Sequence, residues 1–467
     1  MYNNPLGKVL SKSSLKEFEF VSSGFFEGNY VQLGAKYSKD KETIIVGEVL
    51  TKEGINPYLE NPSTFNYLKE TDESTSSWNL YLIKVKPIAA IEDGVPRAVN
   101  FPAPPGTNVF LADADMVSVA LGLQKEGASI GFLKQLRNVR VHLSEAELCR
   151  THFSILGRTG SGKSYFAKGL LRNIKDRRLI IFAPTDEYNE IAKELGAQVV
   201  AKESLSLPLD ISYLASVYNL TLQEQTTLDQ LFRSESAIQE KDTFSNQEIA
   251  QMLSSASRLR WKEREQARLP GMESISVRSD ETERVDRFLG NVLSKIRSKS
   301  LIFSKAPLKV PFSKNTIIDM SELEQEAQEV IVMYVLNNLL QSYKNEKKRK
   351  NYPNLIVAIE EVHNFAPSVQ TTACKSKIIQ TSREGRKLGI GLCLITQRPR
   401  HFDQTVLSQC GSLFLFHIPH PEDVEHVFGT SPVYRKELLD AVRELTVGEC
   451  LVLGDVARYP IVCTVKF

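Results

Sequence analysis

Gly157-Arg158-Thr159-Gly160-Ser161-Gly162-Lys163-Ser164 is the stretch that decides the fold of this chain. It follows an apolar run, Phe153 to Leu156, and precedes a helix-forming run, Tyr165 to Ile174. Glycines at this spacing let the backbone wrap a triphosphate so that consecutive N–H groups point inward. The pattern therefore predicts a phosphate-binding loop between a buried strand and a helix.

The chemistry of this loop follows from its last residues. Lys163 is expected to reach the β- and γ-phosphates of ATP, and the Ser164 hydroxyl to hold Mg²⁺. We expect the nucleotide-binding segment to comprise Thr159, Gly160, Ser161, Gly162, Lys163, Ser164 and Tyr165. The alternative, a glycine-rich turn with a surface lysine, is disfavoured because a strand and an amphipathic helix flank the loop. The next apolar run, Leu179 to Phe182, is predicted to be the neighbouring strand.

The composition indicates a globular protein of two or three domains, with 467 residues, 42% of them hydrophobic and 24% charged. Because 58 basic and 56 acidic residues nearly cancel, a DNA-binding surface must be local, such as the lining of a pore. The six cysteines form no C-x-x-C pair, which indicates buried thiols in a reducing compartment and disfavours a zinc site. The absence of a long apolar run predicts a cytoplasmic protein that does not span a membrane.

Residues 1–140 contain short β-branched or aromatic runs separated by glycine, proline or asparagine, a spacing that predicts a small β-barrel. These runs are Phe18–Val21, Tyr30–Leu33, Thr43–Leu50 and Leu80–Val85. No catalytic cluster is visible in this part, so a packing or assembly domain is the favoured interpretation.

From about residue 141, strands and helices alternate, which predicts an α/β core with a parallel sheet covered on both faces. We expect the core to occupy residues 141–211 and 298–467, around a helical insertion at 212–297. Helices of the insertion are predicted at residues 223–232, 246–268 and 280–299. Its basic residues alternate with glutamates, so a solvated helix face is favoured over a nucleic-acid site.

The second part of the core is expected to begin with a strand at Thr316–Asp319. Ser321 and Glu324 predict a capping box for a following helix at Glu326–Tyr343. Asp319 lies between strand and cap, where an acid is more often a turn former than a metal ligand.

A second strong signal is the buried strand predicted at Leu355–Ile359, which ends in Glu360 and Glu361. At the carboxyl edge of such a strand, one carboxylate can hold Mg²⁺, directly or through water. The other can orient and deprotonate the water that attacks the γ-phosphate. The alternative, two solvent-facing glutamates at the start of a loop, is disfavoured by the phosphate-binding loop upstream.

A helix predicted at Cys374–Leu388 carries Arg383 and Arg386 near its end, and the strand Ile390–Thr396 follows, with Gln397 behind it. A polar side chain in the last position can sense the γ-phosphate. An arginine from the cluster can act in a neighbouring subunit's site as an arginine finger. For any single arginine here, a structural role is the favoured alternative.

Together these motifs resemble the HerA family of hexameric ATPases, relatives of FtsK-type DNA pumps, over nearly the whole chain. The segments that carry the resemblance are His152–Gly157, Ile359–His363, Ser382–Gly389, Thr396–Pro399 and Val447–Gly454. The resemblance implies a HAS-type barrel at the N-terminus and a P-loop NTPase core of the RecA-like or FtsK-like kind.

The resemblance also implies an assembly: a homo-hexameric ring with ATP at the subunit interfaces and double-stranded DNA in the central channel. Lys163 would bind phosphate, Ser164 and Glu360 the metal, and Glu361 would activate water.

Three further roles come from the resemblance. Arg383 would be the arginine finger offered to the neighbour, and Gln397 the sensor. An arginine just upstream of the phosphate loop also matters in the family, and Arg150 is the candidate here, although it is one residue out of register.

The chain departs from the family after its second core strand. The family pattern resembles Asp-Pro-His-Gly-Glu-Tyr, whereas this chain has Ala183-Pro184-Thr185-Asp186-Glu187-Tyr188. The usual acid is replaced by Ala183, so either Asp186 or Glu187 substitutes for it, or hydrolysis is slowed.

Two functions fit these motifs. The first is an ATP-dependent DNA translocase that supplies a separately encoded NurA-like nuclease, because the chain has no nuclease motif of its own. The alternative is an ATP-binding hexameric scaffold of an antiphage complex that organises a nuclease or a sirtuin-like NAD-consuming effector. A third interpretation, an ATPase of conjugative secretion, is disfavoured by the lack of a membrane segment.

Overall fold

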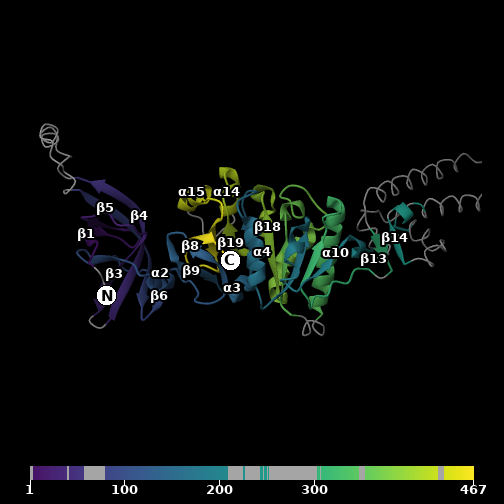
Figure 1. Ribbon diagram of the computed structural model, residues 1–467, viewed down its shortest axis with the longest axis horizontal. Helices are drawn as coiled ribbons and strands as arrows, with labels where there is room; N and C mark the ends of the chain where they lie inside the picture. The colour runs from purple at the N-terminus through teal and green to yellow at the C-terminus, as the bar shows by residue number, and fades with distance from the viewer. Residues whose placement is uncertain are drawn as a thin grey trace, which may run out of the picture.

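The computed structural model describes residues 4–38, 41–56, 79–208, 225–226, 242–245, 247–249, 251, 302–305, 307–345, 353–429 and 436–467. Three sheets follow one another along the long axis of the molecule: an N-terminal barrel, a large core sheet and a small three-stranded sheet (Figure 1). The small sheet consists of β13 (Ser206–Pro208), β15 (Ile302–Ser304) and β14 (Thr243–Ser245). The helices predicted for the insertion lie outside the described residues, apart from a few positions.

The N-terminal strands close into a barrel, as predicted. Its six strands, in spatial order, are β2 (Phe18–Ser22), β1 (Gly7–Ser13), β7 (Asn108–Leu111), β3 (Tyr30–Ser38), β4 (Lys41–Ile55) and β5 (Leu80–Glu92). Strand β5 pairs back with β2, and β6 (Val95–Arg97) extends β5 at the edge. Alternate residues such as Phe18, Phe20 and Ile83 point inward and are fully buried, as the two-residue period of a strand requires.

The core sheet has eleven strands. Their spatial order is β12 (Gln198–Val200), β16 (Thr316–Asp319), β11 (Arg178–Ala183), β17 (Leu355–Ile359), β18 (Ile390–Thr396), β10 (His152–Leu156), β19 (Cys410–Leu415), β20 (Glu449–Gly454), β21 (Ile461–Val465), β8 (Ala128–Leu133) and β9 (Leu136–Leu143). Neighbours from β12 to β19 are parallel, and those from β19 to β9 are antiparallel. The parallel part carries the predicted α/β core.

Two features of this sheet differ from what the sequence indicated. The run Leu179–Phe182 lies in β11, which is not the neighbour of β10, because β17 and β18 lie between them. That prediction was wrong, since every residue of β17 and β18 is buried and such strands take the central positions of a sheet. In addition, β8 and β9 lie largely within the stretch expected for the barrel but pair in the core sheet.

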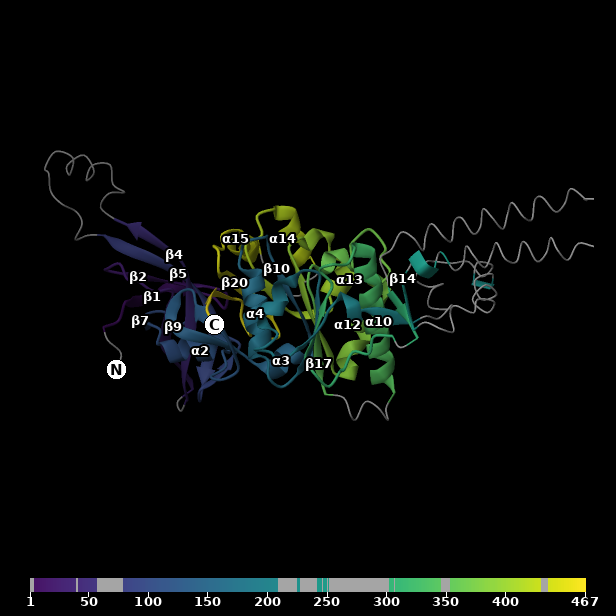
Figure 2. The same cartoon turned by 45° about the vertical axis from the view of Figure 1, so that its right-hand side comes forward.

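Helices cover both faces of the core sheet (Figure 2). One face packs against α2 (Ala114–Leu121), α3 (Glu145–Arg150) and α4 (Lys163–Asn173). The other packs against α10 (Gln325–Lys344), α12 (Lys375–Leu388), α13 (Gln404–Leu407), α14 (Pro421–Phe428) and α15 (Lys436–Arg443). None of the helices in the described part of the chain is long and apolar enough to span a membrane.

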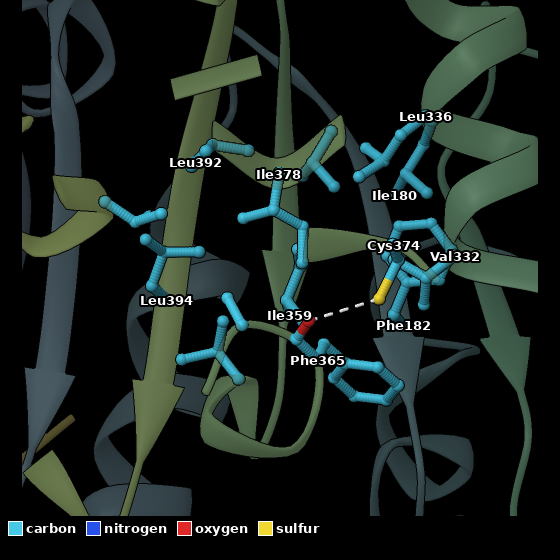
Figure 3. Close-up of a cluster of buried hydrophobic side chains, with 14 of the residues drawn as sticks. Ile180, Phe182, Val332, Leu336, Ile359, Phe365, Cys374, Ile378, Leu392 and Leu394 are labelled. Carbon is cyan, nitrogen blue, oxygen red and sulfur yellow. Dashed lines mark hydrogen bonds between the residues drawn. The ribbon is translucent and has the colours of Figure 1, made fainter. Parts of the chain in front are cut away.

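Figure 3 shows the packing on the second face, where side chains of α10 and α12 meet the central strands. Leu336 lies beside Ile180, Val332 lies beside Cys374 and Phe182, and Cys374 donates a hydrogen bond of 3.3 Å to the carbonyl oxygen of Phe365. The described cysteines form no disulfide, and four of the five are fully buried. Burial of these residues agrees with the prediction of small apolar side chains.

Helix α10 begins without the predicted capping box. Its N-cap is Glu324, which forms no side-chain cap hydrogen bond. The Ser321 hydroxyl and amide instead donate to Asp319 Oδ1 at 2.7 and 3.0 Å, so this serine is used in the turn that precedes the helix. The capping box was therefore wrong, whereas the favoured role of Asp319 as a turn former is confirmed.

Candidate nucleotide-binding site

The predicted phosphate loop connects β10 to α4 at the carboxyl edge of the parallel strands. The amide of Phe416 donates to Leu156 O at 2.8 Å, and the amide of Arg158 donates to His417 O at 3.0 Å, which fixes the loop to the segment after β19. Gly157 has φ +154°, and a Cβ there would lie 2.6 Å from Phe416 Cβ. Gly162, the N-cap of α4, has φ +104°. Only glycine takes these conformations readily, so the glycines give the loop its shape.

Lys163 points back into the loop. Its side chain is 8% exposed, and its Nζ donates to Arg158 O at 3.0 Å. Burial lowers the pKa of Lys163, while the carboxylates of Glu361 and Glu360 oppose the shift. A lysine side chain at a helix N-terminus, where unpaired backbone amides also gather, is complementary to the oxygens of a phosphate chain.

Strand β17 delivers Glu360 to the same edge of the sheet. Its side chain is 6% exposed, and Oε2 has no hydrogen-bond partner among the described residues. Burial, with the negative charges of Glu187 and Glu361 nearby, raises the pKa of Glu360 to about 7. This carboxyl group is therefore partly protonated at neutral pH.

Glu361 links several parts of the site. Its backbone is left-handed, with φ 48° and ψ 44°, an arrangement that costs a non-glycine residue energy and is often found at functional sites. Its Oε2 lies 3.2 Å from His363 Nδ1, and it accepts a hydrogen bond of 3.5 Å from the amide of Gln397. Gln397 Oε1 in turn accepts from the hydroxyl of Thr159. The loop, the second carboxylate and the predicted sensor are thus connected.

Three neighbours of the site were not assigned roles from the sequence or were left as alternatives. Lys168 pairs with Glu187 at 3.9 Å and with Glu190 at 3.5 Å, and its charge lowers the pKa of Glu360. The negative charge of Glu187 raises the pKa of both Glu360 and Lys163. Asp186, in contrast, forms no hydrogen bond or ion pair with the described residues. Lys168 is four residues after Ser164, one helical turn, and this spacing was the signal that could have identified it.

The residues fit a nucleotide with magnesium. The buried, unpartnered Oε2 of Glu360 is an oxygen that a cation would satisfy, and the hydroxyl of Ser164 lies at the N-terminus of α4 on the loop. Within the described residues there is no group of three or more His, Cys, Asp or Glu that would hold a metal by itself. A magnesium ion here would take its remaining ligands from phosphate and water, as is usual for this ion.

The predicted arginines lie at the opposite edge of the sheet. Arg383 is exposed near the C-terminal end of α12, beside the start of β10, where His152 lies 2.8 Å from Ser382 O. Arg150 precedes β10 and pairs with Glu147 at 2.8 Å and Asp455 at 3.9 Å. The five residues of β10, about 17 Å of extended chain, lie between this edge and the loop.

A pocket of about 500 Å³ opens beside the loop, within the size range of ligand sites. Thr159 and Gln397 border it on one side, and His420 and Asp423 at the start of α14 border it on the other. It gives access to the loop from the face that carries η5 (Pro399–His401) and α14.

Both the sequence and the structure of this chain are similar to those of known proteins. The family model "Helicase HerA, central domain" matches residues 128–339. The chain is 25% identical over 97% of its length to the DNA double-strand break repair helicase HerA of Pyrococcus furiosus, of which 91% is covered. It is 24% identical over 97% of its length to the protein of that name from Sulfolobus acidocaldarius, of which 92% is covered.

Among solved structures, VirB4 of Thermoanaerobacter pseudethanolicus is similar with a TM-score of 0.50 and 17% identity, covering 74% of this chain and 97% of that one. At this identity the likeness concerns the fold alone, and it agrees with the P-loop ATPase architecture of the core.

Proposed function

We propose that this chain, which is similar to HerA helicases along nearly its whole length, is an ATP-dependent translocase of double-stranded DNA. The observation that carries the proposal is the meeting of Lys163, Glu360, Glu361 and Gln397 around one phosphate loop. The curated relatives that match along nearly the whole chain are named as repair helicases, which supports DNA as the substrate.

In the proposed cycle, Lys163 exchanges its contact with Arg158 O for the β- and γ-phosphates. Ser164 and Glu360 would hold magnesium, which when bound neutralises charge on the phosphates. Deprotonated Glu360 is the form suited to this task, and its pKa of about 7 makes the site sensitive to pH near neutrality.

Glu361 orients and deprotonates the attacking water in this proposal. The amide of Gln397 donates to its carboxylate at 3.5 Å, and His363 Nδ1, which is hydrogen-bonded to Thr396 Oγ1, lies 3.2 Å from it, so the base has fixed neighbours before the water arrives. Gln397 also contacts Thr159 of the loop. A change in the phosphates would therefore reach the end of β18 through this side chain.

In the family pattern an aspartate stands at the position of Ala183. We propose that Glu187 performs the role of that aspartate in this chain. Its charge acts on both Lys163 and Glu360, and Lys168 holds it at 3.9 Å. This arrangement supports hydrolysis by a chain that lacks the usual aspartate, although the carboxylate comes from the next turn and not from the strand end.

The remote position of Arg383 supports a ring. Arg383 is exposed at the edge of the sheet opposite its own loop, a position suited to contact with the site of a neighbouring subunit, as an arginine finger makes. We propose a homo-hexamer with double-stranded DNA in the channel and a NurA-like nuclease supplied in trans. A scaffold of an antiphage complex, organising an effector with little movement along DNA, is the competing outcome.

The test is the steady-state ATPase rate of the purified protein with and without linear duplex DNA, using Lys163→Ala as the blank. The translocase predicts several-fold stimulation by DNA that the blank lacks. A slow rate that is indifferent to DNA would contradict the translocase and favour the scaffold. Activity equal in the blank and the wild type would overturn the site itself.

A further inference from the structure

Three large apolar side chains are exposed around the phosphate loop. Tyr165, the first residue after Ser164, is 56% exposed, Val447 is 70% exposed and Phe467 is 37% exposed. Few large hydrophobic side chains of the described residues are this exposed, and these three lie in segments that meet at the start of α4. Figure 2 shows the C-terminal end of the chain beside α4 and β20.

The three side chains are held in place by the fold. The rings of Tyr165 and Phe467 meet edge to face, with centroids 5.6 Å apart. Phe467 also lies over Gly169, where an added Cβ would approach the ring to 2.2 Å, so the helix carries glycine where the ring needs room. These contacts define an aromatic pair on the first turns of α4.

Val447 is held by the turn that precedes β20. The amide of Gly448 donates to Ser161 O of the loop at 3.1 Å, and Val465 donates to Gly448 O at 2.8 Å. Glu449 fastens the same turn, because it accepts from Lys134 at 2.8 Å and from the amide of Thr446 at 2.9 Å. Val447 is therefore exposed at a fixed position against the loop.

The sheet order places this surface on a defined side of the loop. Strands β17 and β18, which carry Glu360, Glu361 and Gln397, lie on one side of β10. Strands β19 and β20 lie on the other side, with Val447 at the loop. Lys163 and the carboxylates fix the γ-phosphate end of a nucleotide, and the amides at the start of α4 hold its α-phosphate end. The nucleoside must then leave the loop near Tyr165.

We propose that Tyr165, Val447 and Phe467 form the surface on which the base and ribose of the bound nucleotide pack. The inference rests on the proposed nucleotide site and names a further part of it. The base is the occupant that the geometry favours, because its flat apolar face matches an aromatic edge at the end of the phosphate chain. Stacking of a base on an aromatic side chain is favourable for every base, so the surface would add affinity with modest selectivity.

The test compares ATP with inorganic tripolyphosphate, both with magnesium, by direct calorimetric titration of the full chain. Tyr165→Ala and Phe467→Ala are each expected to weaken ATP binding roughly five- to fiftyfold and to leave tripolyphosphate binding within about twofold. Phe467→Trp should retain most of the ATP affinity. Phe25→Ala removes an exposed aromatic side chain of the barrel and is the matched control.

Each result decides the proposal. Equal losses for ATP and tripolyphosphate would show that the surface only supports the loop, and unchanged ATP affinity would show that the base binds elsewhere. Loss of ring mass in size-exclusion chromatography with light scattering would show a subunit interface instead. Failure of the wild type to bind either ligand would overturn the proposed nucleotide site and not merely this surface.

Discussion

The charge of Glu360 is balanced near neutral pH. It is buried, its Oε2 has no partner, and two other carboxylates act on it. Its pKa of about 7 lies above the ordinary value of 4.5, so folding favours the protonated form. The folded state therefore loses stability as the pH rises from about 4.5 to 7, by up to about 3 kcal/mol, and no further above that.

Replacing Glu360 with glutamine tests this balance at the residue scale. In the absence of nucleotide, the free energy of unfolding of Glu360→Gln should exceed that of the wild type by more at pH 8 than at pH 5. Denaturant melts at the two pH values measure it. Conversely, magnesium-dependent ATP affinity of the wild type should rise from pH 6 to 8 and stay flat in the variant. A stability difference that is the same at both pH values would contradict the raised pKa.

At this scale the sequence located the ends of the strands but not the contacts between them. Lys163, Glu360 and Gln397 could be identified because each follows a strand or loop signal in the chain. The pairing of Lys168 with Glu187 depends on the position of η2 (Asp186–Ile191) over α4, which no local pattern specifies. The proposal of Glu187 and not Asp186 likewise depends on contacts of the folded structure.

The loop between β10 and α4 is the element whose geometry tolerates least change. Gly157→Ala introduces a Cβ at φ +154°, 2.6 Å from Phe416 Cβ. We expect a loss of at least about 2 kcal/mol of stability together with most ATP affinity, because the loop must move away from β19. Thermal melting and nucleotide titration measure both effects.

Gly94→Ala is the matched control for this change. Gly94 also has a positive φ, 75°, but a Cβ there meets nothing within 4 Å. Its replacement should cost only about 1 kcal/mol and leave ATP affinity unchanged. Equal effects of the two substitutions would mean that the contact with Phe416 does not shape the loop.

The positions of strands along the chain were easier to predict than the order in which the strands lie in the sheet. The strands of the barrel and the core were visible as apolar runs, whereas the order of β11, β17, β18 and β10 follows from crossovers that skip positions in the sheet. The failed capping box has a similar cause. Ser321 has the right spacing from Glu324, but its hydroxyl and amide donate hydrogen bonds to Asp319 and not to the helix.

At the scale of the whole molecule, the position of Arg383 makes a prediction about assembly. Subunits carrying Arg383→Ala and subunits carrying Glu361→Gln should each be inactive alone. Mixed before ring assembly, they should recover hydrolysis at roughly a quarter of the interfaces, where an intact loop meets an intact arginine. The ATPase rate across mixing ratios measures the recovery.

The control mixture combines Arg383→Ala subunits with subunits that carry both substitutions. No interface in that mixture has an intact arginine, so no recovery is expected. A flat rate in the first mixture, with mixed rings demonstrated by native mass spectrometry, would show that Arg383 does not act across the interface.

The path from the barrel to the loop has a mechanical consequence. After α2 the chain enters β8, which pairs with β21 through Phe132 and Thr464, and the next residue, Val465, binds the turn at Gly448 that touches Ser161. Hydrogen bonds of an antiparallel ladder lie across the strands, so a pull along β8 loads them together in shear and does not open them one by one. The barrel is thus connected to the loop through paired strands that resist stretching. A force on the barrel can therefore be transmitted to the loop, and a movement of the loop can be transmitted to the barrel.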